Sequence, residues 1–210
     1  MLGLIIKGGW VMLPIILCSI LSLAIIFERL FFYFSIRKNT LSVLPQIMEL
    51  VRKNKITETV DICEKNPFYA TNILKAGLIH SEESKEVIKE AMENASLYEI
   101  PKLEHNLHFL STIAHISPLL GLLGTATGLV RCFQVIESKV SAAGMINPSD
   151  FASGIWEALI TTVAGLCVAI PAYIMYNYFV HRVNLAVLFA ERAATELLEF
   201  LPQSRYTDEV

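Results

Sequence analysis

The chain has 210 residues, 54% of them hydrophobic and 18% charged, with a formal net charge of −3. This composition is too apolar for an ordinary soluble domain, and the nearly balanced charge gives no indication of nucleic-acid binding. A membrane-spanning helix needs about 20 consecutive apolar residues, and three segments reach that length. The sequence therefore predicts an all-α membrane protein with three transmembrane helices in contact with membrane lipid.

The first apolar segment, Gly8–Phe27, is followed by Glu28 and Arg29. These two charges are expected to mark the cytoplasmic boundary of the span, with a pair inside the helix bundle as the alternative. A signal peptide is disfavoured because bulky aromatic residues, and no small-residue cleavage site, follow the apolar run. Residues 1–35 are thus expected to hold the outside N-terminal end and the first transmembrane helix.

Residues 36–106 form a polar segment that is predicted to be helical. Its apolar residues recur at helical spacing from Leu44 to Cys63, and Asn66-Pro67 then breaks the pattern. Ser81 is expected to cap a further helix, which Pro101 either kinks or ends. The helical pattern resumes at once and enters the second span. We expect a helical cytoplasmic region here.

The distribution of positive charge predicts the topology, because lysines and arginines stay on the cytoplasmic side. Residues 36–106 hold more than half of the 17 lysines and arginines, whereas only Lys7 precedes the first span and only Lys139 lies in 137–150. The N-terminus and 137–150 are therefore expected outside, with 36–106 and a C-terminal helix at 182–210 inside. Two of the transmembrane helices are expected to extend into the cytoplasmic region.

The second span, 107–136, contains the motif GLLGTATG at 121–128. One interpretation is close helix packing through the glycines, with the threonine hydroxyls bonded back to their own helix. The other is that a threonine faces a polar lumen. The residues concerned are Gly121, Gly124, Thr125, Thr127 and Gly128.

The third span, 151–181, contains a single charged residue before its end, Glu157. An intramembrane carboxylate is costly and usually marks an ion or proton path. The alternative is that Ala158–Val180 spans the bilayer alone and leaves Glu157 at the outer boundary. Thr161 lies one turn beyond on nearly the same face. A stripe of small residues follows another face: Ala158, Thr162, Gly165 and Ala169.

The evidence for a functional role is weaker for the other polar residues and the prolines of the spans. Pro118 and Pro171 are expected to kink their helices. His115 suits either a proton relay or a hydrogen-bonded packing role, and Arg131 and Arg182 are expected at or near the interfaces.

No enzyme is predicted, because phosphate-binding loops, nucleophile elbows and metalloprotease motifs are missing from the sequence. The four cysteines lack metal-ligand or redox spacing and are expected to be buried free thiols. Neither a cofactor nor a metal site is expected.

Two stretches closely resemble signatures of the ExbB/TolQ/MotA proton-channel family. They are ISPLLGLLGTATGLV at 116–130 and GIWEALITTVAGLCVAIPAYIMYN at 154–177. Their order, the three spans and the large insert after the first span point to the ExbB/TolQ branch. The insert itself, 36–106, matches only in size and helical character.

The resemblance implies positions for the site. Glu157 matches the family's third-span acid, Thr162 the threonine after it and Thr125 the second-span threonine, all lining a pentameric ring. Thr161 is added to the expected lining, although relatives often have alanine there, and Thr127 replaces a common tryptophan. Gly121, Gly124, Gly128 and Gly165 are expected to pack helices.

The resemblance also implies the physiology. The chain is expected in the bacterial inner membrane with a periplasmic N-terminus and a cytoplasmic C-terminus. An ExbD/TolR-like single-span partner with an intramembrane Asp is expected to carry protons, and a TonB- or TolA-like protein to transmit the work. A non-conducting scaffold and a self-sufficient channel are the alternatives, and the sequence leaves open whether the ion is H⁺ or Na⁺.

Overall fold

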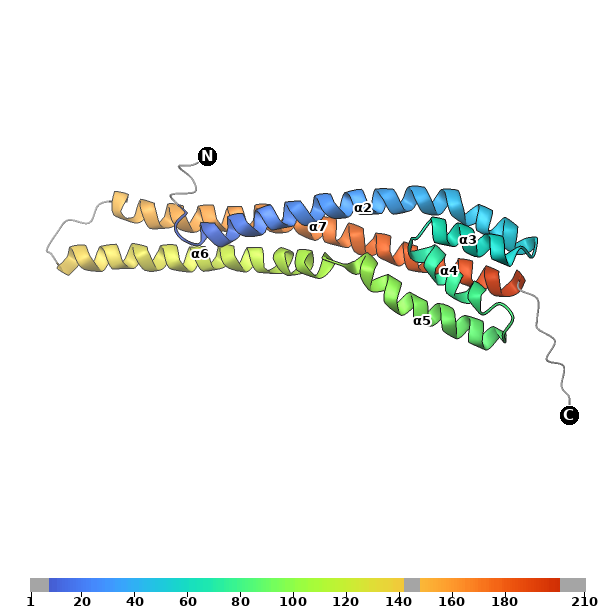
Figure 1. Cartoon of the computed structure of the whole chain (residues 1–210). Helices are drawn as coiled ribbons and strands as arrows, with labels where there is room; N and C mark the ends of the chain where they lie inside the picture. The colour runs from blue at the N-terminus through green and yellow to red at the C-terminus, as the bar shows by residue number, and fades with distance from the viewer. Residues whose placement is uncertain (1–7, 142–147, 201–210) are drawn as a thin grey trace. The chain divides into compact units, whose positions relative to one another are not determined.

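The computed structural model describes residues 8–141 and 148–200, and within these ranges every regular element is a helix (Figure 1). The helices of the described residues are, in chain order, α2 (Met12–Arg52), α3 (Ile56–Lys65), α4 (Tyr69–Ile79), α5 (Lys85–Glu104), α6 (Leu107–Ser141) and α7 (Pro148–Phe200). Three helical segments are long and apolar enough to cross a membrane: Met12–Ile36, Leu107–Ser141 and Phe151–Phe200. The predictions of an all-helical fold and of three helices able to span are confirmed.

Two of the long helices extend further than the sequence predicts. α2 continues through Pro45 to Arg52, and α6 continues to Ser141. Since α7 begins at Pro148, helix occupies part of the segment 137–150 that the sequence predicts as a loop. Residues 142–147 lie outside the described residues.

The breaks between the polar helices differ from the predicted ones. The prediction of one continuous helix from Leu44 to Cys63 is wrong. α2 ends at Arg52 and α3 begins at Ile56, and Asn54 between them has a φ of 54°. Asparagine is one of the few residues that tolerate this left-handed conformation. The break at Asn66-Pro67 is confirmed, because α3 ends at Lys65.

The start and end of α5 also need correction. The cap is Ser84, whose hydroxyl accepts a hydrogen bond from the Val87 amide, and not Ser81. Pro101 lies inside α5, and the helix ends beyond it at Glu104. The prediction that this helix continues without a break into the second span is therefore wrong, because Asn106, with a φ of 64°, separates α5 from α6.

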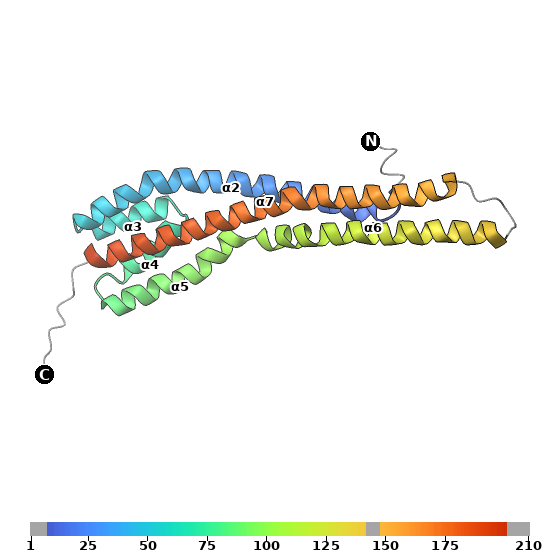
Figure 2. The same ribbon diagram turned by 180° about the vertical axis from the view of Figure 1, so that it is seen from behind.

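The chain divides into two compact units. The first comprises residues up to Glu28 together with Asn106–Tyr178, and the second comprises Arg29–His105 together with the chain from Phe179 onward. In the first unit the beginning of α2 packs on α6 and α7, where three buried residues, Val11, Met12 and Ile15, contact partly buried apolar side chains: Leu120, Ile160, Ala164 and Val168. Figures 1 and 2 show α6 lying beside the first half of α7.

In the second unit, α3, α4 and α5 gather beside the end of α7 (Figures 1 and 2). Large apolar side chains fill this unit, and several are fully buried: Ile47, Leu74, Leu78, Ile88, Leu103, Phe179 and Leu197. Arg29 is also buried here, with its guanidinium donating to His105 and lying 4.8 Å from the Phe32 ring centre. The cytoplasmic boundary predicted at Glu28 and Arg29, and the alternative of a pair inside the bundle, both stay predictions.

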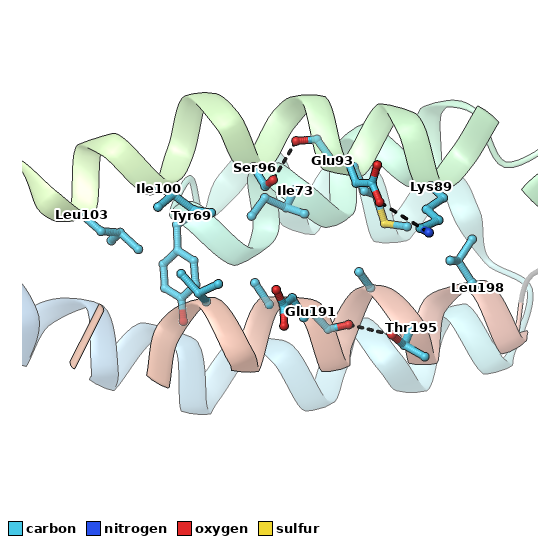
Figure 3. Close-up of a pocket in the computed structure, with 14 residues that line it drawn as sticks. Tyr69, Ile73, Lys89, Glu93, Ser96, Ile100, Leu103, Glu191, Thr195 and Leu198 are labelled. Carbon is cyan, nitrogen blue, oxygen red and sulfur yellow. Dashed lines mark hydrogen bonds and ion pairs between the residues drawn. The ribbon is translucent and has the colours of Figure 1, made fainter. Parts of the chain in front are cut away.

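A hollow of about 390 Å³ lies between α4, α5 and the last part of α7 (Figure 3). Its lining is largely apolar, including Ile73, Ile100 and Leu198, and the Lys89–Glu93 ion pair lies at its edge. The hollow holds no convergent set of reactive groups.

The turn that begins α4 depends on the buried Thr71 hydroxyl. This oxygen accepts a hydrogen bond from the Phe68 amide at 3.0 Å and donates to the carbonyl oxygens of Asn66 and Phe68. Thr71→Val keeps the shape but leaves the Phe68 amide without its acceptor. Leaving a buried polar group unpaired costs about 1–3 kcal/mol, and the free energy of unfolding in detergent should fall by that amount. In the exposed control Thr195→Val a loss below about 0.5 kcal/mol is expected, and equal losses would contradict the role of Thr71.

Burial raises the pKa of the Cys63 thiol to about 11 from 9.0, despite the opposing charge of Lys75. The folded protein therefore favours the neutral thiol, and this contribution to stability is complete below pH 9 and declines as the pH rises toward 11. We expect the free energy of unfolding of the natural chain to fall more steeply across this window than that of Cys63→Ala. Parallel pH profiles would show that burial of this thiol has no such effect.

Candidate functional site

Glycines let the backbones of α6 and α7 come close together. A Cβ atom at Gly128 would lie 2.7 Å from the Gly154 carbonyl oxygen, and one at Gly121 would lie 3.1 Å from the Thr162 Cα. A Cβ at Gly124 would overlap the Thr161 side chain. Gly165 makes the same kind of approach from α7, against Ser117 and Gly121. These four glycines therefore lie inside the helix contact.

Glu157 lies in this contact, 6% exposed, and is paired with Arg131 of α6. The Nη1 of Arg131 donates to both carboxylate oxygens, at 2.9 and 2.8 Å. The arginine side chain is half exposed, whereas the glutamate side chain is 8% exposed. Since α7 begins at Pro148, Glu157 lies roughly 14 Å along the helix. Glu157 is thus a buried carboxylate with a cationic partner.

The turn before α2 covers the same carboxylate. Gly9 has a φ of 69°, a conformation that favours glycine. A Cβ atom added there would overlap the Glu157 carboxyl group and lie 3.4 Å from the Arg131 Nη1. A side chain at position 9 would therefore displace the ion pair.

The four predicted threonines donate their hydroxyls to backbone carbonyl oxygens. Thr125 donates to Leu122 at 2.6 Å, and Thr127 donates to Gly124 at 3.1 Å. Thr162 bonds across to the Gly121 carbonyl and back to Ala158, each at 3.3 Å, while Thr161 bonds to Glu157 and Ala158 within its own helix. Thr125 and Thr162 are partly exposed.

Thr161 is fully buried beneath Gly124. The predicted lumen lining by Thr161 stays a prediction; in the single chain α6 covers that face of α7.

A cavity of about 330 Å³ adjoins the ion pair. α6 and α7 both contribute to its wall, which is polar apart from a valine, a cysteine and a glycine: Arg131, Cys132, Gln134, Val135, Ser138, Ser153, Gly154 and Glu157. Glu157 and Arg131 thus face a space that can admit water or an ion.

The remaining predicted residues do not join this site. Pro118 and Pro171 lie inside α6 and α7, which continue past them, and the predicted kinks stay predictions. The His115 ring is bonded to the Ser111 carbonyl at 2.7 Å and meets Tyr173 edge-on. Within 8–141 and 148–200, no group of histidine, cysteine, aspartate or glutamate is arranged to hold a metal ion.

Comparison with known proteins identifies the family of this chain. The family model for the MotA/TolQ/ExbB proton channel family matches residues 64–191. The chain belongs to this family. It is similar to an ExbB-like biopolymer transport protein of Synechocystis, with 35% identity over 83% of this chain and 68% of the relative. It is also similar to biopolymer transport protein exbB1 of Vibrio cholerae, with 29% identity over 88% and 78% of the two chains.

A third relative is the Tol-Pal system protein TolQ of Haemophilus influenzae, with 42% identity over 45% of this chain and 40% of the relative. These names support the ExbB/TolQ branch of the proton channel family, as the sequence motifs predict. The family is one of membrane transport proteins, which agrees with the three apolar helices.

The α6–α7 contact has a direct test in Gly124→Ala. The added methyl group overlaps Thr161, and overpacking of this kind costs about 1–3 kcal/mol, more than the helix propensity gained. We expect a lower midpoint of thermal unfolding in detergent. The control is Ala126→Ser, at an exposed position of the same helix. A Gly124→Ala protein as stable as the control would contradict the close contact.

Proposed function

We propose that the chain is a subunit of an ion-driven motor complex of the ExbB/TolQ type, energised by the proton-motive force. The observation that carries this proposal is Glu157, a buried carboxylate beside a polar cavity and within a segment able to span the membrane. In a proton channel family, an acid in such a position is suited to an ion path.

The proposed topology places the N-terminus in the periplasm and the C-terminus in the cytoplasm of the bacterial inner membrane. The predicted regions follow from it: 1–35 with the first span, 36–106 and 182–210 in the cytoplasm, 107–136 and 151–181 as spans, and 137–150 outside. The concentration of lysines and arginines in 36–106 supports this orientation.

We assign the polar lining of the path to Glu157, Thr162 and Thr125. The two threonines are partly exposed and carry hydroxyls that can exchange a backbone acceptor for water. Thr161 has a different role in this proposal: its buried side chain fills the space left by Gly124 and sets the distance between the helices. Five copies of the chain form the ring, in line with the family resemblance.

The partner is an ExbD/TolR-like protein with a single span, whose intramembrane Asp carries the protons inside the ring. Each proton that enters across 100 mV gains about 2.3 kcal/mol, which is available to move the partner. A TonB- or TolA-like protein transmits this work to an outer-membrane process such as TonB-dependent uptake. Glu157 and the threonines supply the polar and hydrated surroundings.

The first test is proton uptake into proteoliposomes under an imposed potential, with this chain alone and with a co-expressed partner of the ExbD/TolR type. We expect uptake only with the partner, and its loss when the partner's Asp is replaced by Asn. Equal uptake by the chain alone would favour a self-sufficient channel instead. Repeating the assay with a Na⁺ gradient identifies the ion.

Glu157→Gln should reduce uptake by the complex at least severalfold, because the lining loses its fixed negative charge. Thr195→Val, on a helix surface away from Glu157, is the control and should leave uptake unchanged. Unchanged uptake and unchanged cellular energisation in Glu157→Gln would overturn the role of Glu157. A mutant that loses only thermal stability would indicate a non-conducting scaffold.

A further inference from the structure

We infer that the cavity beside Glu157 is the entrance vestibule of the ion path, and that Arg131 determines its electrostatic preference by neutralising Glu157. This inference rests on the proposed function and identifies a second residue in it. Its basis is the geometry of the pair, the turn at Gly9 and the lining of the cavity.

The first step concerns what holds the Glu157 carboxylate. The hydroxyls of Thr161 and Thr162 are directed to backbone carbonyls, whereas a single Arg131 nitrogen donates to both carboxylate oxygens. Arginine is always protonated, so it supplies a permanent positive charge. Arg131 is therefore the residue that positions the carboxylate.

The second step concerns access. The Gly9 turn covers the carboxylate on one side, and Ala158 and Thr161 beyond it on α7 are buried. The cavity, lined by both Glu157 and the half-exposed Arg131, is the open side. An ion that approaches Glu157 through this cavity meets Arg131 first.

The third step is the charge balance. Together the two side chains contribute no net charge to the cavity. Removal of the arginine charge leaves a carboxylate that attracts cations, and removal of the glutamate charge leaves a guanidinium that repels them. Clefts lined by one sign of charge change the local ion concentration by about tenfold or more. The two substitutions must therefore act in opposite directions.

This opposition distinguishes the inference from a structural ion pair. In a purely structural pair, Arg131→Gln leaves the buried Glu157 carboxylate without its partner, and Glu157→Gln leaves the half-exposed guanidinium without its own, so both substitutions lower the stability of the protein. A residue that determines electrostatic preference instead gives opposite effects in the two single variants and compensation in the double variant.

The experiment measures the cavity potential directly, without requiring ion flux. Ser153, which is exposed and lines the cavity, is replaced by cysteine as a reporter in a chain whose Cys18, Cys132 and Cys167 are replaced by alanine. Cys63 can stay, because its side chain is 1% exposed and out of reach of the reagents. The rates of modification by a cationic and an anionic methanethiosulfonate reagent are compared in nanodiscs.

We expect Arg131→Gln to raise the ratio of the cationic to the anionic rate by about tenfold and Glu157→Gln to lower it comparably. The double variant should return to the starting ratio. Arg131→Lys keeps the charge and should leave the ratio nearly unchanged, as should Lys85→Gln, which removes an exposed cation at the start of α5. Helicity measured by circular dichroism shows that each variant is folded.

Shifts of the ratio in the same direction in both single variants, or no shift in either, would overturn the inference. A reporter cysteine that reacts with neither reagent would also overturn it, because the vestibule would then be closed to solvent. If the shifts are opposite but proteoliposomes with the partner show no uptake, the proposed function fails while the electrostatic role of Arg131 stands.

Discussion

The close approach of α6 and α7 is the constraint on which the site depends. Lipid tails are as apolar as leucine, so helices in a membrane associate through packing and hydrogen bonds and gain little from the hydrophobic effect. The glycines of α6 permit this packing, and the Thr162 hydroxyl adds a bond to the Gly121 carbonyl across the interface. Arg131 follows Gly128 by less than one turn, and Glu157 follows Gly154 by the same interval. The contact that joins the backbones therefore also brings the two charges together.

The ion pair formed in this way contributes little to the net stability of the protein. Burial of the Glu157 carboxylate and partial burial of Arg131 cost free energy of desolvation, and the attraction between the two charges only roughly repays that cost. The same pair is much more consequential for the cavity, because the field of a charge is stronger where water is scarce. The proposed role of Arg131 and Glu157 therefore rests on this field and not on stability.

The features that could be predicted from the sequence are those that depend on local patterns. Length and hydropathy identified three helices able to span, and the single acid in an apolar run identified Glu157. Two features escaped prediction because they depend on tertiary contacts. Arg131 and Glu157 are 26 residues apart, and nothing in either segment encodes their pairing. Gly9 lies at the start of the predicted first span with nothing in the sequence to distinguish it, and its φ of 69° and its position against Glu157 explain why it lacks a side chain. The helix breaks at Asn54 and Asn106 were missed because a left-handed residue leaves no mark in hydrophobic spacing.

The threonines and the ion pair divide the polar chemistry of the site between them. A hydroxyl bonded to a backbone carbonyl can turn to water or an ion at a net cost of about 1 kcal/mol, so Thr125 and Thr162 offer polar groups that adapt to what passes. The charges of Arg131 and Glu157 are held by each other and are far more expensive to separate. In the proposed ion path, the threonines are the adaptable part of the lining and the ion pair is its fixed electrostatic part. In this arrangement Thr161, which neither faces the cavity nor bonds the carboxylate, maintains the helix spacing at which the ion pair forms.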